Sequence, residues 1–185
     1  MTDPVPFNPA AWHAANVGLP VGPELAALLF PHDSPAEGMS MLTYRGKFGY
    51  VSTCALYAMA YCRAIGLTHP DLDRGYFSQN TRAPQILQHV GEKYGAWSTA
   101  PDDLLTLPVA GDVIAVTSPW HAICVTGSDG PTGALDDVAG GGGDGRAITR
   151  RLHQVTTSGG KLWLHDPAWG SPRAIVGRLV ASRLG

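Results

Sequence analysis

The hydrophobic pattern of this chain changes period near residue 110, and that change constrains the fold more than any other feature. Before it, apolar residues recur at helical spacing, which predicts helices over residues 54–65 and 83–94. After it, short apolar or β-branched runs bounded by glycine and proline predict strands over residues 112–116, 121–126 and 161–165. Helices that come first and strands that follow indicate an α+β fold with segregated elements.

Glycines mark the ends of both predicted helices. Gly66 follows the first helix, with Pro70 behind it, and Gly95 follows the second. One further helical turn is expected over residues 102–105. These boundaries fit the left-handed glycine that commonly ends a helix.

The length of 185 residues is enough for one domain with a proper core and too small for two full domains. Residues 1–45, rich in proline and alanine, are interpreted as an N-terminal arm with one short helix over residues 23–30. Residues 46–185 are predicted to form the body. Its glycine-rich segment, about residues 127–160, is interpreted as a flexible insertion, in which residues 146–156 fit either an extra strand or a short helix.

The composition argues against several function classes. Charged residues make up 15% of the chain, the formal net charge is −2 and there is no basic run, so nucleic-acid binding is not expected. No segment approaches the roughly 20 apolar residues of a membrane-spanning helix. The N-terminus lacks the basic and apolar regions of a signal peptide, which predicts a cytoplasmic protein, or one exported by a dedicated secretion system.

Three cysteines in no zinc-binding spacing predict reduced thiols rather than a disulfide framework. Cys62 and Cys124 lie in apolar runs and are interpreted as core residues. Neither a metal nor an organic cofactor is expected. Five scattered histidines have no ligand spacing and are interpreted as surface residues: His13, His32, His69, His89 and His153.

Cys54 differs from the other two cysteines because it falls at a predicted helix start. Ser52 and Thr53 are suitable N-cap residues, which places Cys54 in the first turn of the helix. There the helix dipole lowers the pKa of a thiol from its usual value of about 8.5, and unpaired backbone N–H groups can stabilise an oxyanion. Cys54 is therefore a candidate nucleophile.

The segments that follow Cys54 come in an informative order: Gly111 to Val116, then His121 to Gly127, then Leu164 to Gly170. Together with the cysteine helix, this order resembles the papain-like cysteine peptidases over about residues 50–175, and within them it is similar to bacterial bacteriocin-processing and effector peptidases. The resemblance implies a nucleophile helix packed on a C-terminal antiparallel sheet, and hydrolysis of amide bonds by an effector or toxin. It also implies Cys54 as nucleophile, His121 as general base and acid, and Asp166 as the residue that orients the imidazole.

Strand geometry supports the pairing of His121 with Asp166. If the two strands that carry them are antiparallel neighbours, the start of one lies beside the end of the other. His165 alternates with Asp166 and is expected to face the other way. Trp169 is placed either to cover the histidine–aspartate pair or to pack as an ordinary core residue.

Papain-like enzymes usually carry a glutamine a few residues before the cysteine to help hold the oxyanion, and residues 47–52 contain none. The backbone N–H of Cys54 remains as a donor, with Tyr50 or Ser52 as side-chain candidates. This departure leaves open a second hypothesis, a catalytically inactive papain-like binding module. An immunity or inhibitor protein is a further candidate partner.

The CHAP and NlpC-type amidases, which cut peptidoglycan peptides, share the same cysteine-then-histidine order. In them the third polar group follows soon after the histidine strand, where this chain has Asp136 and Asp137. Asp166 is preferred because its strand is better formed and the segment around Asp136 is interpreted as a loop. The expected substrate is therefore a peptide or peptidoglycan.

Overall fold

The structure is a computed structural model that describes residues 7–18, 53–69, 83–117, 121–128, 134–140 and 147–185. Its α-helices in these ranges are α1 (Pro9–Asn16), α4 (Thr53–Ala64), α6 (Ala83–Lys93) and α7 (Pro101–Leu105). The strands are β1 (Trp97–Ser98), β2 (Val113–Val116), β3 (His121–Ser128), β4 (Ala134–Gly140), β5 (Ala147–Ser158), β6 (Lys161–His165) and β7 (Arg173–Leu179). Most of the helices precede the main strands, so the protein has the α+β organisation that the change of period predicts.

The predicted helix boundaries are confirmed in α4 and α6. Beyond α4, Gly66 has a φ of +85°, Leu67 N donates to Cys62 O at 2.9 Å, and Gly66 N donates to Arg63 O at 2.9 Å. This pattern closes the helix end with a left-handed residue. Gly95 has a φ of +64° beyond α6 and plays the same part.

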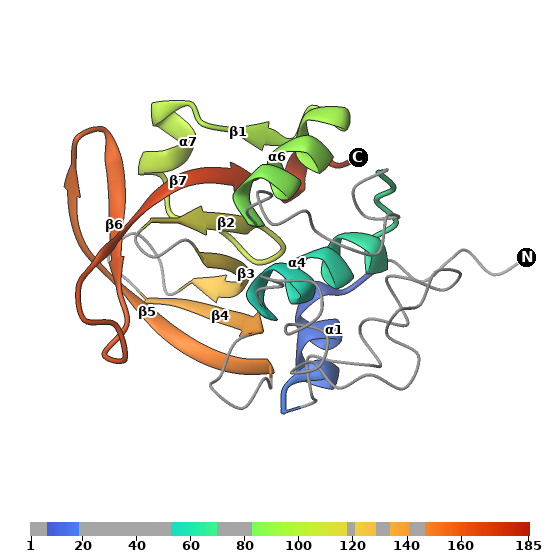
Figure 1. The fold of residues 1–185 in the computed structure, drawn as a ribbon, viewed down its shortest axis with the longest axis horizontal. Helices are drawn as coiled ribbons and strands as arrows, with labels where there is room; N and C mark the ends of the chain where they lie inside the picture. The colour runs from blue at the N-terminus through green and yellow to red at the C-terminus, as the bar shows by residue number, and fades with distance from the viewer. Residues whose placement is uncertain (1–6, 19–52, 70–82, 118–120, 129–133, 141–146) are drawn as a thin grey trace, which may run out of the picture.

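The strands form one antiparallel sheet in the order β1-β7-β2-β3-β4-β5-β6, and β6 also pairs with β7. The sheet therefore curls until β6 meets β7, with β1 outside the closed part (Figure 1). The first half of β5 pairs with β4 and its second half with β6, while β7 pairs with β6 at its start and with β1 and β2 further on. Register shifts in three of these pairings supply the local bends that such a curl requires.

The curl gives the sheet an enclosed face and an outer face, each with its own apolar cluster. Residues alternate between the two faces along each strand, as in β3, where Ile123 faces inward while Ala122 and Cys124 face α4. The helices α4 and α6 cover the outer face (Figure 1). The buried inner cluster consists of Leu104, Ile114, Val116, Ile123, Val125, Leu152, Leu162, Leu164, Trp169 and Ile175.

A buried ion pair fastens β2 to β7 on this frame. Arg178 Nε donates to Asp112 Oδ2 at 2.9 Å, and the other carboxylate oxygen accepts Ala181 N at 2.9 Å. Asp112 Oδ2 also accepts Val109 N at 2.8 Å. Through these bonds Asp112 fixes the start of β2, the strand that precedes His121 in the chain.

Two expectations about the strands are wrong. The segment around Asp136, expected to be a loop, is the strand β4, because residues such as Leu135 and Leu152 pair across β4 and β5. Residues 147–156, for which a strand and a short helix were alternatives, belong to β5. Residues 141–146 of the glycine run lie outside the described residues. The pairing of β3 with β6 is also wrong: the two strands run antiparallel as expected, but β2 and β7 separate them on one side and β4 and β5 on the other.

In the N-terminal arm, one histidine predicted to be a surface residue is buried. The helix expected over residues 23–30 lies outside the described residues, and the described part of the arm contains α1. His13 on α1 is buried rather than exposed, with Nδ1 2.9 Å from the Tyr57 hydroxyl and its ring stacked on Tyr61 at 4.7 Å. Burial lowers the pKa of His13 to about 4, which keeps the ring neutral. The arm therefore packs on α4 through an aromatic cluster.

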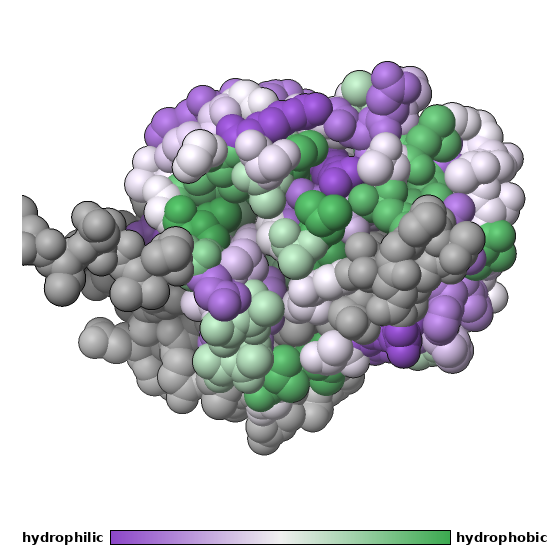
Figure 2. Space-filling model, turned by 180° about the vertical axis from the view of Figure 1, so that it is seen from behind, coloured by the Kyte–Doolittle hydropathy of each residue, from purple (hydrophilic) through white to green (hydrophobic). Residues whose placement is uncertain are grey.

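The exposed apolar residues of the described part are scattered over the surface. Large exposed apolar residues come from separate elements and include Phe7, Leu105 and Val155. Figure 2 shows hydrophobic areas on the rear face broken up by hydrophilic and intermediate ones. No helix within the described ranges combines the length and apolar character needed to cross a bilayer.

Candidate active site

Along several strands, the inward-facing apolar side chains give way to polar ones at the same end of the sheet. His121 precedes Ile123 by two positions on β3, and Asp166 follows Leu164 by two positions beyond β6. Because side chains two apart on a strand share a face, both extend the inner cluster. The same spacing puts Arg150 before Leu152 on β5 and Arg173 before Ile175 on β7.

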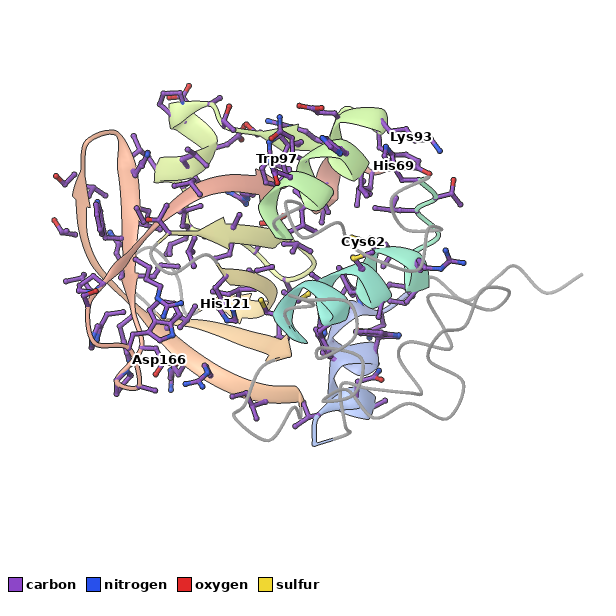
Figure 3. All side chains as sticks on the ribbon, viewed as in Figure 1. Cys62, His69, Lys93, Trp97, His121 and Asp166 are labelled. Carbon is purple, nitrogen blue, oxygen red and sulfur yellow. The ribbon has the colours of Figure 1, made fainter. Side chains whose placement is uncertain are left out.

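Strand direction brings these four residues to the same end. In the antiparallel sheet β3, β5 and β7 run one way and β6 runs the other. Residues near the starts of the first three strands therefore lie toward the same end as the residue that follows β6. Figure 3 shows His121 and Asp166 on the sheet side of the molecule, beyond the N-terminal end of α4.

Asp166 is buried and held by two hydrogen bonds. Its Oδ2 accepts Arg150 Nη1 at 2.9 Å, and its Oδ1 accepts the backbone N–H of Ala168 at 2.7 Å. Trp169 N donates to Asp166 O at 2.8 Å, so the turn after β6 is fixed as well. Among the described residues the Asp166 carboxylate bonds to Arg150 and Ala168 and not to the His121 ring.

The electrostatic surroundings keep His121 neutral. Burial and the charges of Arg173 and Arg150 together lower the pKa of His121 to about 4, and the charge of Asp166 opposes them only in part. An imidazole in this state can accept a proton from a thiol, although its affinity for that proton is low.

Trp169 connects His121 to Arg173. The Trp169 ring meets the His121 ring edge-on, with the centroids 6.4 Å apart at 90°. The guanidinium of Arg173 lies 4.2 Å from the centroid of the same indole, a cation–π distance. Trp169 is 8% exposed, so it shields the polar cluster and also packs in the inner core.

Cys54 belongs to the other layer of the fold. It lies in the first turn of α4, is 4% exposed, and packs in the outer core with Cys124 and with Ala122, the residue after His121. Burial lowers the pKa of Arg173, and Asp166 and, to a smaller extent, Cys54 act in the opposite direction. Cys54 therefore lies within electrostatic range of Arg173.

The other two cysteines have the packing role that their apolar surroundings predict. Cys62 and Cys124 are 0% and 1% exposed, and burial raises the pKa of the Cys62 thiol to about 12. Figure 3 shows Cys62 further along α4, away from His121. A thiol with so high a pKa is protonated and unreactive at neutral pH.

The competing carboxylates, Asp136 and Asp137, lie on β4, whose side chains are outside the described part of the chain. The backbone register sets Asp137 opposite Val125 and Arg150, four residues along β3 from His121. At about 3.3 Å per residue, that position is roughly 13 Å along the strand from His121. Residues 47–52, with the side-chain oxyanion candidates, also lie outside the described residues.

Two members of the cluster, Arg150 and Arg173, are absent from the sequence-based prediction. Their spacing of two residues from Leu152 and Ile175 is a signal for a shared face, but only once β5 and β7 are known to be strands. No three His, Cys, Asp or Glu side chains in the described ranges are grouped to bind a metal ion.

The fold and this cluster define an α+β protein in which a curled antiparallel sheet carries a histidine, a carboxylate and two arginines beside the thiol of a covering helix. Comparisons of the chain with known protein families, with curated proteins and with solved structures give no significant match.

Proposed function

We propose that the protein is a papain-like cysteine hydrolase that cleaves amide bonds, with Cys54, His121 and Asp166 in its site. One observation carries the proposal: Cys54, at the start of α4, packs in the same cluster as Ala122, the residue after His121, and strand direction brings Asp166 to the same end of the sheet as His121. The charge of Asp166 also raises the pKa of His121. A thiol at a helix start, a neutral imidazole and a carboxylate are the groups that such a reaction needs.

In the proposed reaction, Cys54 Sγ attacks the carbonyl carbon of the scissile amide while His121 takes the thiol proton. The backbone N–H groups at the start of α4 stabilise the tetrahedral oxyanion. The intermediate collapses as His121 gives the proton to the departing amine, which leaves a thioester on Cys54. A water molecule then attacks the thioester with His121 again as base, and releases the acid and the thiol.

Asp166 favours the imidazolium that forms in each step, since its charge raises the pKa of His121. Arg150 holds that carboxylate through the 2.9 Å ion pair, and both arginines oppose protonation of His121. The arginines therefore favour return of the proton from His121 to the leaving amine, which speeds the collapse step at the expense of the attack step.

The test is hydrolysis of two substrates, purified peptidoglycan and a denatured protein, by the wild type and by Cys54→Ala. We expect one of the two to be cleaved by the wild type and neither by Cys54→Ala. Cys62→Ala is the matched control, because it removes a buried thiol from the same helix. Cleavage that persists in Cys54→Ala would rule out this nucleophile, and the substrate that is cleaved distinguishes a peptidase from a CHAP-like or NlpC-like amidase.

A second candidate function is a papain-like binding module without catalysis. The lowered pKa of His121 favours it, together with the Arg150 ion pair that engages Asp166. This candidate predicts no hydrolysis of either substrate and an ordinary, slow reaction of the Cys54 thiol with alkylating agents.

A further inference from the structure

We propose that the contact between α1 and α4 is a pH-sensitive switch: α1 stays docked while the His13 ring is neutral and is released when the ring takes up a proton. The inference concerns how the N-terminal arm is held on the body of the protein (Figure 1). It does not depend on the proposed function.

His13 lies at the centre of the contact between the two helices. Its ring stacks on the rings of Tyr61 and Tyr57, with centroids 4.7 and 5.8 Å apart, and meets Trp12 edge-on at 5.2 Å. Of the eight residues of α1, His13 is the one that is buried. The docking of this short helix therefore depends strongly on a single titratable side chain.

The hydrogen bonds of the buried ring suit its neutral form. Nδ1 lies 2.9 Å from the Tyr57 hydroxyl, whereas Nε2 is buried with no partner among the described residues. A neutral imidazole has one donor nitrogen and one acceptor nitrogen, but a protonated ring has two donors. Protonation in the docked state would therefore bury an N–H donor that carries positive charge and has no acceptor, which is costly.

The side chains that face His13 from neighbouring elements offer no charge to balance a proton. They are the hydroxyls of Tyr57 and Tyr61 on α4, and beyond these the thiol of Cys124 on β3. Burial raises the pKa of both tyrosines, so they are neutral. Asp112 acts on Tyr61, but its carboxylate is engaged in the ion pair that fastens β2 to β7. α1 itself carries no second titratable side chain.

The direction of the pH dependence follows from these surroundings. Burial lowers the pKa of docked His13 from the ordinary value of 6.5 to about 4, whereas release returns the ring to water and to its ordinary pKa. Docking is therefore strongest above pH 6.5, where the ring is neutral in both states. As the pH falls from 6.5 to about 4, docking should weaken about tenfold for each pH unit, or about 300-fold in all.

The test is amide hydrogen exchange of the full-length protein, followed by NMR between about pH 4 and pH 7.5. Trp12 N and Val17 N report on α1, because they donate to Asn8 O and His13 O. After correction for the intrinsic exchange rate, we expect their protection to fall about tenfold for each pH unit below 6.5. Val125 N on β3 should remain better protected at every pH, since release of α1 leaves the sheet folded. Equal protection of α1 and β3 would overturn the switch, because α1 would then open only with the whole fold.

His13→Phe keeps an aromatic ring in the contact but cannot take up a proton. Its α1 protection should stay constant over the same pH range, while His153→Gln, which replaces an exposed histidine on β5, should behave as the wild type. The same pH dependence in His13→Phe as in the wild type would overturn the proposal.

An NMR titration of the His13 ring in the wild type decides the question even if His13→Phe fails to dock. We expect a pKa well below 6.5 for the docked protein. A ring that takes up its proton near pH 6.5 with α1 still docked would contradict the switch, and would show that the stacked aromatic rings hold the imidazolium by cation–π attraction.

Discussion

Two arginine–aspartate pairs tie strands of the curled sheet together, and they differ in how deeply they are buried. In the first, Arg178 and Asp112 are both buried, and the arginine also donates to two backbone carbonyl oxygens, those of Asp103 at 3.0 Å and Thr106 at 3.3 Å. In the second, Asp166 is buried but Arg150 lies partly open to solvent, and Arg173 is close by. We call these the closed pair and the open pair.

The difference separates a structural role from a functional one. The closed pair has one cation for one anion, and the carboxylate also accepts two backbone N–H groups. The open pair lies beside His121 and reaches solvent through Arg150. Removing one partner of a fully buried ion pair is strongly destabilising, whereas a partly exposed charge can be solvated by water when its partner is removed.

The largest expected effect is on the closed pair. Asp112→Ala leaves the buried Arg178 without its carboxylate, and we expect the free energy of unfolding to fall by about 3–5 kcal/mol. Urea unfolding followed by circular dichroism measures this loss. Arg183→Ala, which breaks the pair with Asp103 from its exposed side and keeps the Ser98–Asp103 hydrogen bond, is the control and should cost less than about 1 kcal/mol. A loss for Asp112→Ala as small as that of the control would contradict the structural role.

The open pair should respond in activity more than in stability. Asp166→Ala removes the carboxylate that favours protonated His121, and we expect hydrolysis to slow by about 100-fold or more. The free energy of unfolding should fall by about 2 kcal/mol at most, since water can solvate Arg150. Asp137→Ala provides the comparison in the same assays. An inactive Asp137→Ala enzyme, together with nearly normal activity in Asp166→Ala, would show that Asp137 on β4 orients the imidazole instead of Asp166.

A smaller effect is expected from the arginine of the open pair. Arg150→Gln removes a charge that lowers the pKa of His121, so that pKa should rise from about 4. His121 acts as a base only when it is unprotonated, so the pH below which activity is lost should rise together with this pKa. The measurement is an NMR titration of the His121 ring, with Arg151→Gln as the control. A His121 pKa that stays near 4 or falls in Arg150→Gln would show that Arg150 has no influence on the site.

The elements that the sequence predicts well are those with a local signal. In α4, α6, β2, β3 and β6, hydrophobic spacing and terminal glycines lie within a few residues of one another. β7 is harder to predict because Gly177 interrupts it. A Cβ at Gly177 would lie 2.1 Å from Trp97 Cζ2, so this glycine serves a contact with a residue 80 positions away.

The site residues, too, are predictable only where the signal is local in the sequence. Cys54, His121 and Asp166 can be selected from motif order, because the residues around each are characteristic. Arg150 and Arg173 become visible only when β6 pairs with both β5 and β7 and the sheet closes. His13 is misjudged for a related reason: nothing on α1 shows that Tyr57 and Tyr61 of α4 will bury it.

The reactivity of the three thiols tests the central claim most directly. All three are buried to a similar degree, at 4%, 0% and 1% exposed for Cys54, Cys62 and Cys124, so access alone predicts equal and slow alkylation. We predict that iodoacetamide at pH 7 labels Cys54 at least about tenfold faster than the other two, as located by mass spectrometry. In His121→Ala that advantage should largely disappear. Equal, slow labelling of all three thiols in the wild type would contradict the assignment of Cys54 as a nucleophile.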